Sequence, residues 1–254
     1  MNWWGKLIGT GVGMLGGPIG ALAGAAIGHL YDDDDPTPQS EKKARILYFA
    51  YFFSCAAKIA KADGSISVKE IEATENIMRR MNLNEETRKF AKNIFRKAKT
   101  NNRSIDLDLK EAACLINYDQ AISLSFIGGL FEIANSNSGK PNELQLRYLM
   151  RAAERLKIDL SIINAWLKNG YSPPHQDGYS STFSLEEAFQ LFDLEVSATD
   201  VAIKKAYHRK AANFHPDKLK SKDLPDEFTN FANAELAKIN LAYDIIRKTR
   251  SNLK

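Results

Sequence analysis

The chain has 254 residues, of which 44% are hydrophobic, and its net charge is +4. This length accommodates two modest domains plus an anchor, and so mild a charge gives no reason to expect a nucleic-acid partner. Two widely separated cysteines, Cys55 and Cys114, form neither a metal pair nor a disulfide framework. Because each lies on an apolar helical stretch, we expect both thiols to be buried and reduced.

The first element is an uncharged segment from Leu7 to Leu30. As a helix it would span about 36 Å, enough to cross a hydrocarbon core of about 30 Å. A cleaved signal peptide is the competing interpretation, but the apolar run is long for one and only Lys6 precedes it. Residues 1–31 are therefore predicted to be a retained transmembrane anchor. Aromatic residues flank it, as interfacial anchors do: Trp3, Trp4 and Tyr31.

Glycines recur at every fourth position of this anchor, in two rows. Residues four apart share one helical face, where small side chains let two backbones approach closely. This pattern predicts a homodimer formed through the transmembrane helix. The alternative stays open that glycine is simply common in membrane helices and that Pro18 kinks this one. The rows are Gly5, Gly9, Gly13 and Gly17, and Gly16, Gly20, Gly24 and Gly28.

Basic residues on either side of the anchor predict its orientation. Lys6 and the terminal amine precede it, whereas Lys42, Lys43 and Arg45 follow it, and acidic residues count little in the positive-inside rule. We therefore expect a single-pass protein with a short N-terminus outside the cytoplasm and the remaining domains inside it.

Two proline-containing polar stretches, 32–40 and 171–182, are predicted to be linkers around a helical domain at 41–170. Apolar residues in that domain follow helical spacing almost throughout and strand-like alternation is absent, so we expect about seven helices. The apolar run from Ile46 to Ala57 is too short to cross a bilayer and is predicted to be a core helix.

The middle domain is weakly similar to itself. The run 60–64 leads to Glu70 and to a helix that ends at 81–83, while the run 134–137 leads to Glu143 and to a helix that ends at 156–158. Two related helical hairpins are the simplest explanation.

The residues from Asp63 to Ile66, with Glu70, also mimic the second half of a calcium-binding EF-hand loop. The first and third positions of that loop would be Ile59 and Lys61, neither of which is a suitable calcium ligand there. We therefore expect a turn at Gly64 between capped helices and no metal site.

Residues 183–254 are predicted to form a third helical region. Ser184 and Glu187 form a capping box that opens a short apolar helix, and Thr199 caps a helix that runs to about Phe214. A further helix begins near Pro225. One face of the second helix is basic and suits an acidic partner surface, while Pro216 ends the helix and displays its neighbours on a loop. The basic residues are Lys204, Lys205, His208 and Arg209.

This arrangement resembles the J-domain of the DnaJ co-chaperone family. The matching segments are 198–200, 203–207, 215–218, 238–240 and 242–243. The resemblance implies docking on a DnaK-type chaperone and stimulation of its ATP hydrolysis. It further implies that His215, Pro216 and Asp217 are the trigger. The predicted partner-binding set also includes Lys204, Lys205, Tyr207, His208, Arg209 and Lys218.

Two positions depart from the pattern of that family. His208 stands where the family usually has Lys or Arg, and Ala202 where it often has an acidic capping residue. An exposed histidine at the first of these positions would make docking mildly pH-dependent.

The middle domain resembles the TerB-like helical domain, in which an Asp-Gly turn and a following Glu recur. Its second hairpin has Asn135 and Asn137 where Asp is usual. With the anchor and the J-domain, the order resembles membrane-anchored DnaJ-like proteins of the bacterial inner membrane. The resemblance therefore implies an all-α chain with a transmembrane helix, a TerB-like bundle and a C-terminal J-domain hairpin.

No enzyme class gains comparable support. The glycine-rich residues lack the GK[ST] ending of a phosphate-binding loop, and the four histidines stand in no Cys-His or Ser-His motif. We expect a regulator of a partner ATPase that needs no cofactor. The alternative is a membrane-tethered adaptor or stress-response scaffold that acts mainly through the TerB-like domain.

Overall fold

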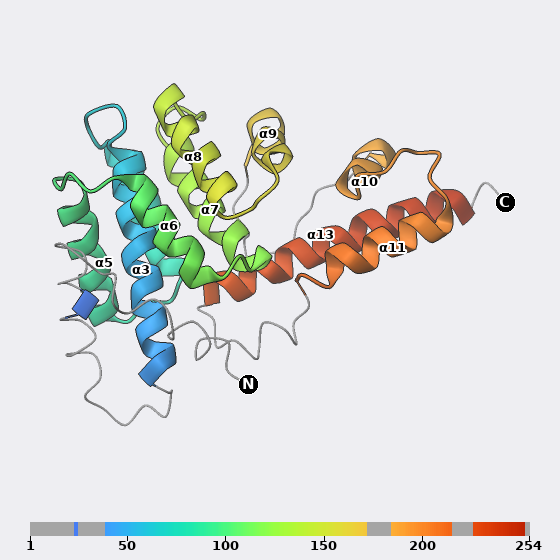
Figure 1. Ribbon diagram of the computed structural model, residues 1–254. Coiled ribbons are helices and arrows are strands. Elements are labelled where there is room, and N and C mark those ends of the chain that lie inside the picture. Colours follow the sequence, from blue (N-terminus) through green and yellow to red (C-terminus); the bar gives the residue numbers. More distant parts are fainter. Residues whose placement is uncertain (1–22, 25–38, 172–183, 215–225, 252–254) are drawn as a thin grey trace. The chain divides into compact units, whose positions relative to one another are not determined.

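The structure is a computed structural model that describes residues 23–24, 39–171, 184–214 and 226–251 (Figure 1). Every regular element in these ranges is an α-helix, which confirms the all-α prediction. Helices α3 to α9 belong to one compact unit, and α10, α11 and most of α13 to a second. The helices are α3 (Gln39–Ala60), α4 (Val68–Arg80), α5 (Glu85–Ala98), α6 (Ile105–Ile116), α7 (Gln120–Asn135), α8 (Glu143–Arg155), α9 (Leu160–Asn169), α10 (Leu185–Leu191), α11 (Asp200–Ala211) and α13 (Asp226–Ser251).

Helix α3 is the centre of the first unit and packs against α5, α6, α7 and α8. Every residue from Ile46 to Ala57 is buried, which confirms that this apolar run is a core helix. The ring of Phe52 packs edge-on against Phe126 of α7, with centroids 5.4 Å apart. At Gly129, one turn further along α7, an added Cβ would lie 2.8 Å from the Phe52 ring. The absence of a side chain at this glycine therefore allows α3 and α7 to approach closely.

Helices α3 to α9 contain an internal repeat. Helices α4 and α8 have 13 residues each and begin at Val68 and Glu143, 75 positions apart. The same offset separates the last residues of α3 and α7 and the first residues of α5 and α9. The predicted pair of related hairpins is therefore part of a longer repeat, α3–α4–α5 and α7–α8–α9, with α6 between its halves.

The caps of α4 and α8 correct one predicted equivalence. Ser67 and Glu70 form a capping box on α4, and Asn142 and Gln145 form one on α8. Glu70 thus corresponds to Gln145, and the prediction that it corresponds to Glu143 was wrong. Glu143 was matched to Glu70 because both are acidic. The equivalent residue is instead the one whose side chain closes the capping box, three positions after the cap.

The turn before α4 is built as expected. Gly64 adopts a φ of +97°, a conformation that favours glycine, and the backbone N–H of Ser65 donates to Oδ1 of Asp63 at 3.3 Å. Both carboxylate oxygens of Glu70 are engaged, because Oε2 accepts from Ser67 and Oε1 from Gln145.

The predicted anchor lies outside the described residues, except for Ala23 and Gly24, which are helical. In the part of the chain that the structure covers, no helix combines the length and the apolar character needed to cross a membrane. The glycine rows therefore stay a prediction.

The second unit contains the three predicted C-terminal helices. Their buried residues lie at the expected helical spacing, including Phe189 on α10, Ile203 and Ala206 on α11, and Ile239 and Ala242 on α13. Helix α11 ends at Ala211, three residues before the predicted end, and a hydrogen-bonded turn continues to Phe214.

Candidate functional site

The basic face of α11 is exposed and its charges are not neutralised. Thr199 caps the helix, accepting a hydrogen bond from the N–H of Ala202 at 3.3 Å. The side chains of Lys204, Lys205, His208 and Arg209 are exposed, and none of them has an ion pair or hydrogen bond with another described residue. We call these four residues the basic face. Since no carboxylate of the described residues pairs with these side chains, the face presents its positive charge to solvent.

Tyr207 lies beside the basic face and connects α11 to α13. Its ring stacks on Tyr243 with centroids 4.1 Å apart and planes 15° apart, and its hydroxyl donates to Oδ1 of Asn240 at 3.0 Å. The side chain is therefore only half-exposed, and it fixes the rotation of α11 relative to α13.

The start of α11 is held by Arg250, from the last turn of α13. Its guanidinium donates to the backbone oxygens of Val196 and Ala198 and to the carboxylate of Asp200, the last at 2.6 Å. At the other end of α11, Lys210 pairs with Asp193 at 2.9 Å. Lys210 is thus excluded from the basic face, although it is adjacent in sequence.

The predicted trigger, His215, Pro216 and Asp217, lies outside the described residues, as does Lys218. The residue directly before it, Phe214, is 6% exposed. Packing therefore fixes the last described residue before the predicted trigger.

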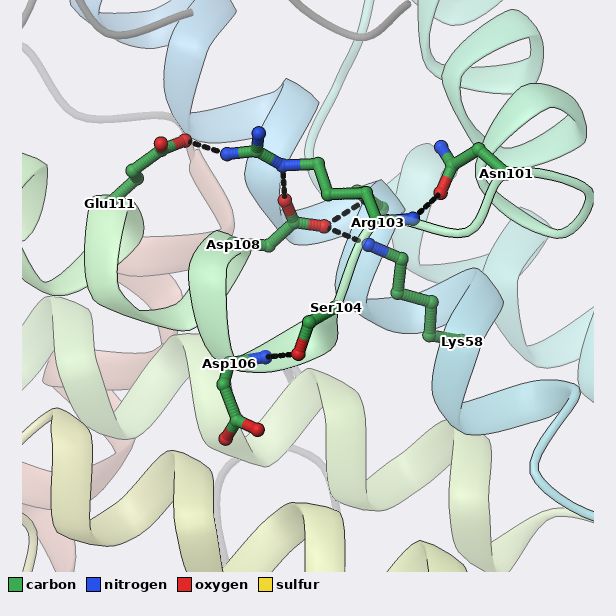
Figure 2. Close-up of polar contacts among 8 residues, drawn as sticks. Lys58, Asn101, Arg103, Ser104, Asp106, Asp108 and Glu111 are labelled. Carbon is green, nitrogen blue, oxygen red and sulfur yellow. Dashed lines mark hydrogen bonds and ion pairs between the residues drawn. The ribbon is translucent and has the colours of Figure 1, made fainter. Parts of the chain in front are cut away.

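A second polar constellation lies in the first unit, and sequence reasoning missed it. Asp108 of α6 is fully buried and accepts hydrogen bonds from Ser54, Lys58 and Arg103. Figure 2 shows the Arg103 guanidinium between Asp108 and Glu111, with Lys58 on the other side of Asp108. Such pairing is what makes a buried carboxylate tolerable.

This network changes the titration of its neighbours. Burial by itself would lower the pKa of Arg103, but hydrogen bonds to Asp108 and Glu111 outweigh burial and raise it. Burial and then the Glu111 carboxylate raise the pKa of the Tyr51 hydroxyl well above its usual range. Burial and then Asp108 also raise the pKa of the Cys55 thiol, which is therefore protonated and unreactive at neutral pH.

The network had a detectable signal in the sequence. Asp108 and Glu111 stand three apart among the apolar residues of α6, on a side of the helix where charge is costly. The basic partners could not be identified in the same way, because Lys58 and Arg103 approach from α3 and from the loop before α6.

The prediction that both cysteines are buried is half correct. Cys55 is buried on α3, but Cys114 is exposed. Helix α6 buries Ala112, Ala113, Leu115 and Ile116, and position 114 falls on its outer side.

Comparison with protein-family models gives three matches along the chain. Residues 1–45 match the co-chaperone DjlA transmembrane domain, residues 51–164 the tellurite resistance protein TerB, and residues 187–252 the DnaJ domain. The order is the one that the motifs predicted.

Whole-chain comparison agrees with the domain matches. The chain is 30% identical over 268 residues to the co-chaperone protein DjlA of Coxiella burnetii, covering 99% of each chain. The chain belongs to the DjlA co-chaperone family. DjlA of Legionella pneumophila is 28% identical, with 98% of this chain and 96% of the relative covered, and DjlA of Salmonella typhimurium is 26% identical, with 98% and 99% covered.

No solved structure gives a significant match to this chain. The basic face of α11 lies in the segment that matches the DnaJ domain, and the buried network lies in the segment that matches TerB.

Proposed function

We propose that this chain is a membrane-anchored co-chaperone whose J-domain docks on a DnaK-type chaperone and stimulates its ATP hydrolysis. The exposed, unpaired basic face of α11 carries the proposal. Family membership supports the co-chaperone role, and the DnaJ-domain match covers the residues that present this face.

The basic face is suited to docking rather than to chemistry. Four side chains that need no internal partner can meet an acidic surface without first breaking an ion pair. Tyr207 and Arg250 hold the helix that carries them, so the charges are positioned before the partner arrives. In this proposal, His215, Pro216 and Asp217 act as the trigger next to the docked helix, with Lys218 adding charge.

The anchor localises this activity. A match to the DjlA transmembrane domain at residues 1–45 supports residues 1–31 as a single-pass helix in the bacterial inner membrane. The linkers 32–40 and 171–182 would then separate the anchor, a TerB-like domain at 41–170 and a J-domain at 183–254. A partner that uses ATP requires the last two domains to face the cytoplasm.

Single-turnover ATP hydrolysis by a DnaK-type chaperone tests the proposal, with the full chain in neutral detergent. The wild-type chain should accelerate hydrolysis, and His215→Gln should abolish the acceleration. Replacing the four residues of the basic face by Ala should raise the half-maximal concentration by about 10-fold or more, because rim charges govern association. Lys248→Ala, an exposed basic residue on α13, is the matched control.

Equal hydrolysis rates with and without the wild-type chain would refute the co-chaperone proposal. The same loss in Lys248→Ala would show that total charge, and not the basic face, is responsible.

The proposed homodimer has its own test. Crosslinking in membranes should trap a dimer that disappears when Gly9, Gly13, Gly20 and Gly24 are replaced by Leu. A dimer that survives these changes would eliminate the glycine rows as its interface.

Protease added to right-side-out membranes tests the orientation. It should leave the J-domain intact, and digestion of the J-domain would contradict the proposed orientation.

A further inference from the structure

The first unit contains a basic surface pocket at the junction of α3, α5, α6 and α8. Its volume is about 300 Å³. Five basic residues line it, and Asp106 is its one acidic lining residue. The basic residues are Lys58, Lys61, Lys99, Arg103 and Arg151.

Three of these five cations are already neutralised. Lys58 pairs with the buried carboxylate of Asp108, and Arg103 pairs with Asp108 and with the partly exposed Glu111 (Figure 2). Arg151 pairs with Asp106 at 3.0 Å. Among the described residues, Lys61 and Lys99 have no carboxylate within ion-pair distance. They give the pocket an uncompensated positive charge.

The geometry holds this charge at the pocket. The ammonium of Lys61 donates to the backbone oxygen of Lys99 at 2.8 Å, which joins the end of α3 to the end of α5. An ammonium has three N–H donors, so two remain for a ligand.

The segment between α5 and α6 closes one side of the pocket. Asn101 lines the pocket, and its Oδ1 accepts from the backbone N–H of Arg103 at 3.1 Å, which fixes the turn that carries Arg103. Helix α6 also begins at the pocket, with Ser104 as its cap.

We propose that this pocket of the TerB-like domain binds the phosphate group of a small phosphorylated ligand. Two unpaired lysines provide the charge for a dianion, and lysine binds phosphate as a point charge. The guanidinium groups of Arg103 and Arg151 are both engaged with acidic side chains, so Lys61 and Lys99 are left to supply the charge that a phosphate group needs.

Two sources could supply such a phosphate, a soluble metabolite or an anionic lipid headgroup. The pocket lies near the C-terminal end of α3, whereas the segment that matches a transmembrane domain joins the other end of this helix. The 22 residues of α3 span about 33 Å at 1.5 Å each. This separation along the helix favours the soluble source.

Isothermal titration of the full chain in neutral detergent with pyrophosphate tests the site. Saturable 1:1 binding is expected for the wild-type chain. The double variant Lys61→Ala, Lys99→Ala should bind about 10-fold more weakly or worse, since each charge-assisted bond contributes substantially. The double variant Lys61→Arg, Lys99→Arg keeps the charge and should bind within about 3-fold of the wild-type chain.

The matched control is Lys110→Ala, Lys140→Ala, which removes two charges from exposed positions outside the pocket. It should bind as the wild-type chain does. Absence of saturable binding to the wild-type chain would overturn the proposal, as would an equal loss in this control or a complete loss in the arginine pair. Circular dichroism should show the same helix content in all variants.

Nanodiscs distinguish the two sources. If the natural ligand is soluble, the affinity for pyrophosphate should be the same in nanodiscs of neutral lipid and in nanodiscs in which about one third of the lipid is phosphatidylglycerol. Weaker binding in the anionic discs that is absent from the alanine pair would assign the pocket to a lipid headgroup. Either result is independent of ATPase stimulation by the J-domain.

Discussion

Gln145 donates a hydrogen bond from Nε2 to Oε1 of Glu70 at 2.9 Å, and these two residues occupy equivalent positions in the two halves of the repeat. Each also closes the capping box of its own helix, Glu70 on α4 and Gln145 on α8. Both side chains are buried, at 0% and 3% exposure. This hydrogen bond therefore connects the two halves of the repeat, and each of its two residues also caps the start of a helix.

Replacing Gln145 by Leu should destabilise the first unit. Leucine has a similar size but leaves the buried Oε1 of Glu70 without its donor and the N–H of Asn142 without its acceptor. The bond to the charged group alone contributes about 1.5–3 kcal/mol. Urea unfolding followed by circular dichroism measures it. Gln120→Leu removes an exposed bond of 3.3 Å to the backbone of Lys157 and should change stability by less than about 0.5 kcal/mol. Equal losses would contradict the role of the buried pair.

Gly129→Ala should destabilise the same unit, although alanine favours helices by about 1 kcal/mol over glycine. The new Cβ would lie 2.8 Å and 2.9 Å from two atoms of the buried Phe52 ring, and such overpacking costs about 1–3 kcal/mol. We expect a net loss of about 1 kcal/mol by thermal unfolding. In the background of Phe52→Leu, which removes the ring, Gly129→Ala should become neutral or stabilising. A loss unchanged by Phe52→Leu would show that the contact is not its cause.

The two thiols should react very differently. Cys114 is exposed, whereas Cys55 is buried and has a raised pKa, first because of burial and then because of Asp108. In the native chain at pH 7.5, one thiol should react quickly with a maleimide reagent, and mass spectrometry should locate the label at Cys114. Cys114→Ser should remove the fast reaction, and denaturant should expose Cys55. Fast labelling of native Cys55 would mean that α3 opens readily.

Arg250→Ala should loosen the J-domain hairpin. The variant loses the bonds to the backbone oxygens of Val196 and Ala198 and the ion pair with Asp200, so a loss of about 1–2 kcal/mol is expected. Faster hydrogen exchange at the start of α11 would show this loss locally. Lys248→Ala, two residues earlier on the same helix, should leave exchange unchanged.

The charge cluster around Glu75 should make stability pH-dependent. Burial would raise the pKa of this carboxyl, but hydrogen bonds from Lys92 and Arg88 outweigh it and hold the pKa below its ordinary value. Its contribution is therefore present at neutral pH and is lost as the pH falls through the lowered pKa. Glu75→Gln should cost about 0.5–1 kcal/mol at pH 7 and progressively less as the pH falls below about 4. Glu72→Gln, at an exposed position of α4, should have no effect at neutral or acidic pH.

Local signals predicted the helices well. The capping box at Ser184, the cap at Thr199 and the turn at Gly64 are each set by residues within three positions, and the structure has all of them. The burial of α3 could also be predicted, because twelve successive residues without a polar face leave the helix no side for solvent.

Properties that depend on distant segments were harder to predict. Cys114 has apolar neighbours, and only the packing of α6 shows that it points outward. Of the three partners of Asp108, Arg103 is five positions away, but Lys58 and Ser54 are 50 and 54 positions away. The correspondence between Glu70 and Gln145 was obscured because a carboxylate and an amide fill the same cap position.

Helix α6 is the one helix of α3–α9 that lies outside the repeat, and it also carries Asp106, Asp108 and Glu111. The two repeated halves contact each other directly and through the Gln145–Glu70 bond, while α6, which has no counterpart in the repeat, carries the acidic side chains of the buried network. Asp106 of α6 lines the pocket, so its substitution should change the affinity of the proposed phosphate site for its ligand without altering the matched halves. Residues that match between the repeated halves are thus constrained by their counterparts, whereas residues of α6 have no counterpart.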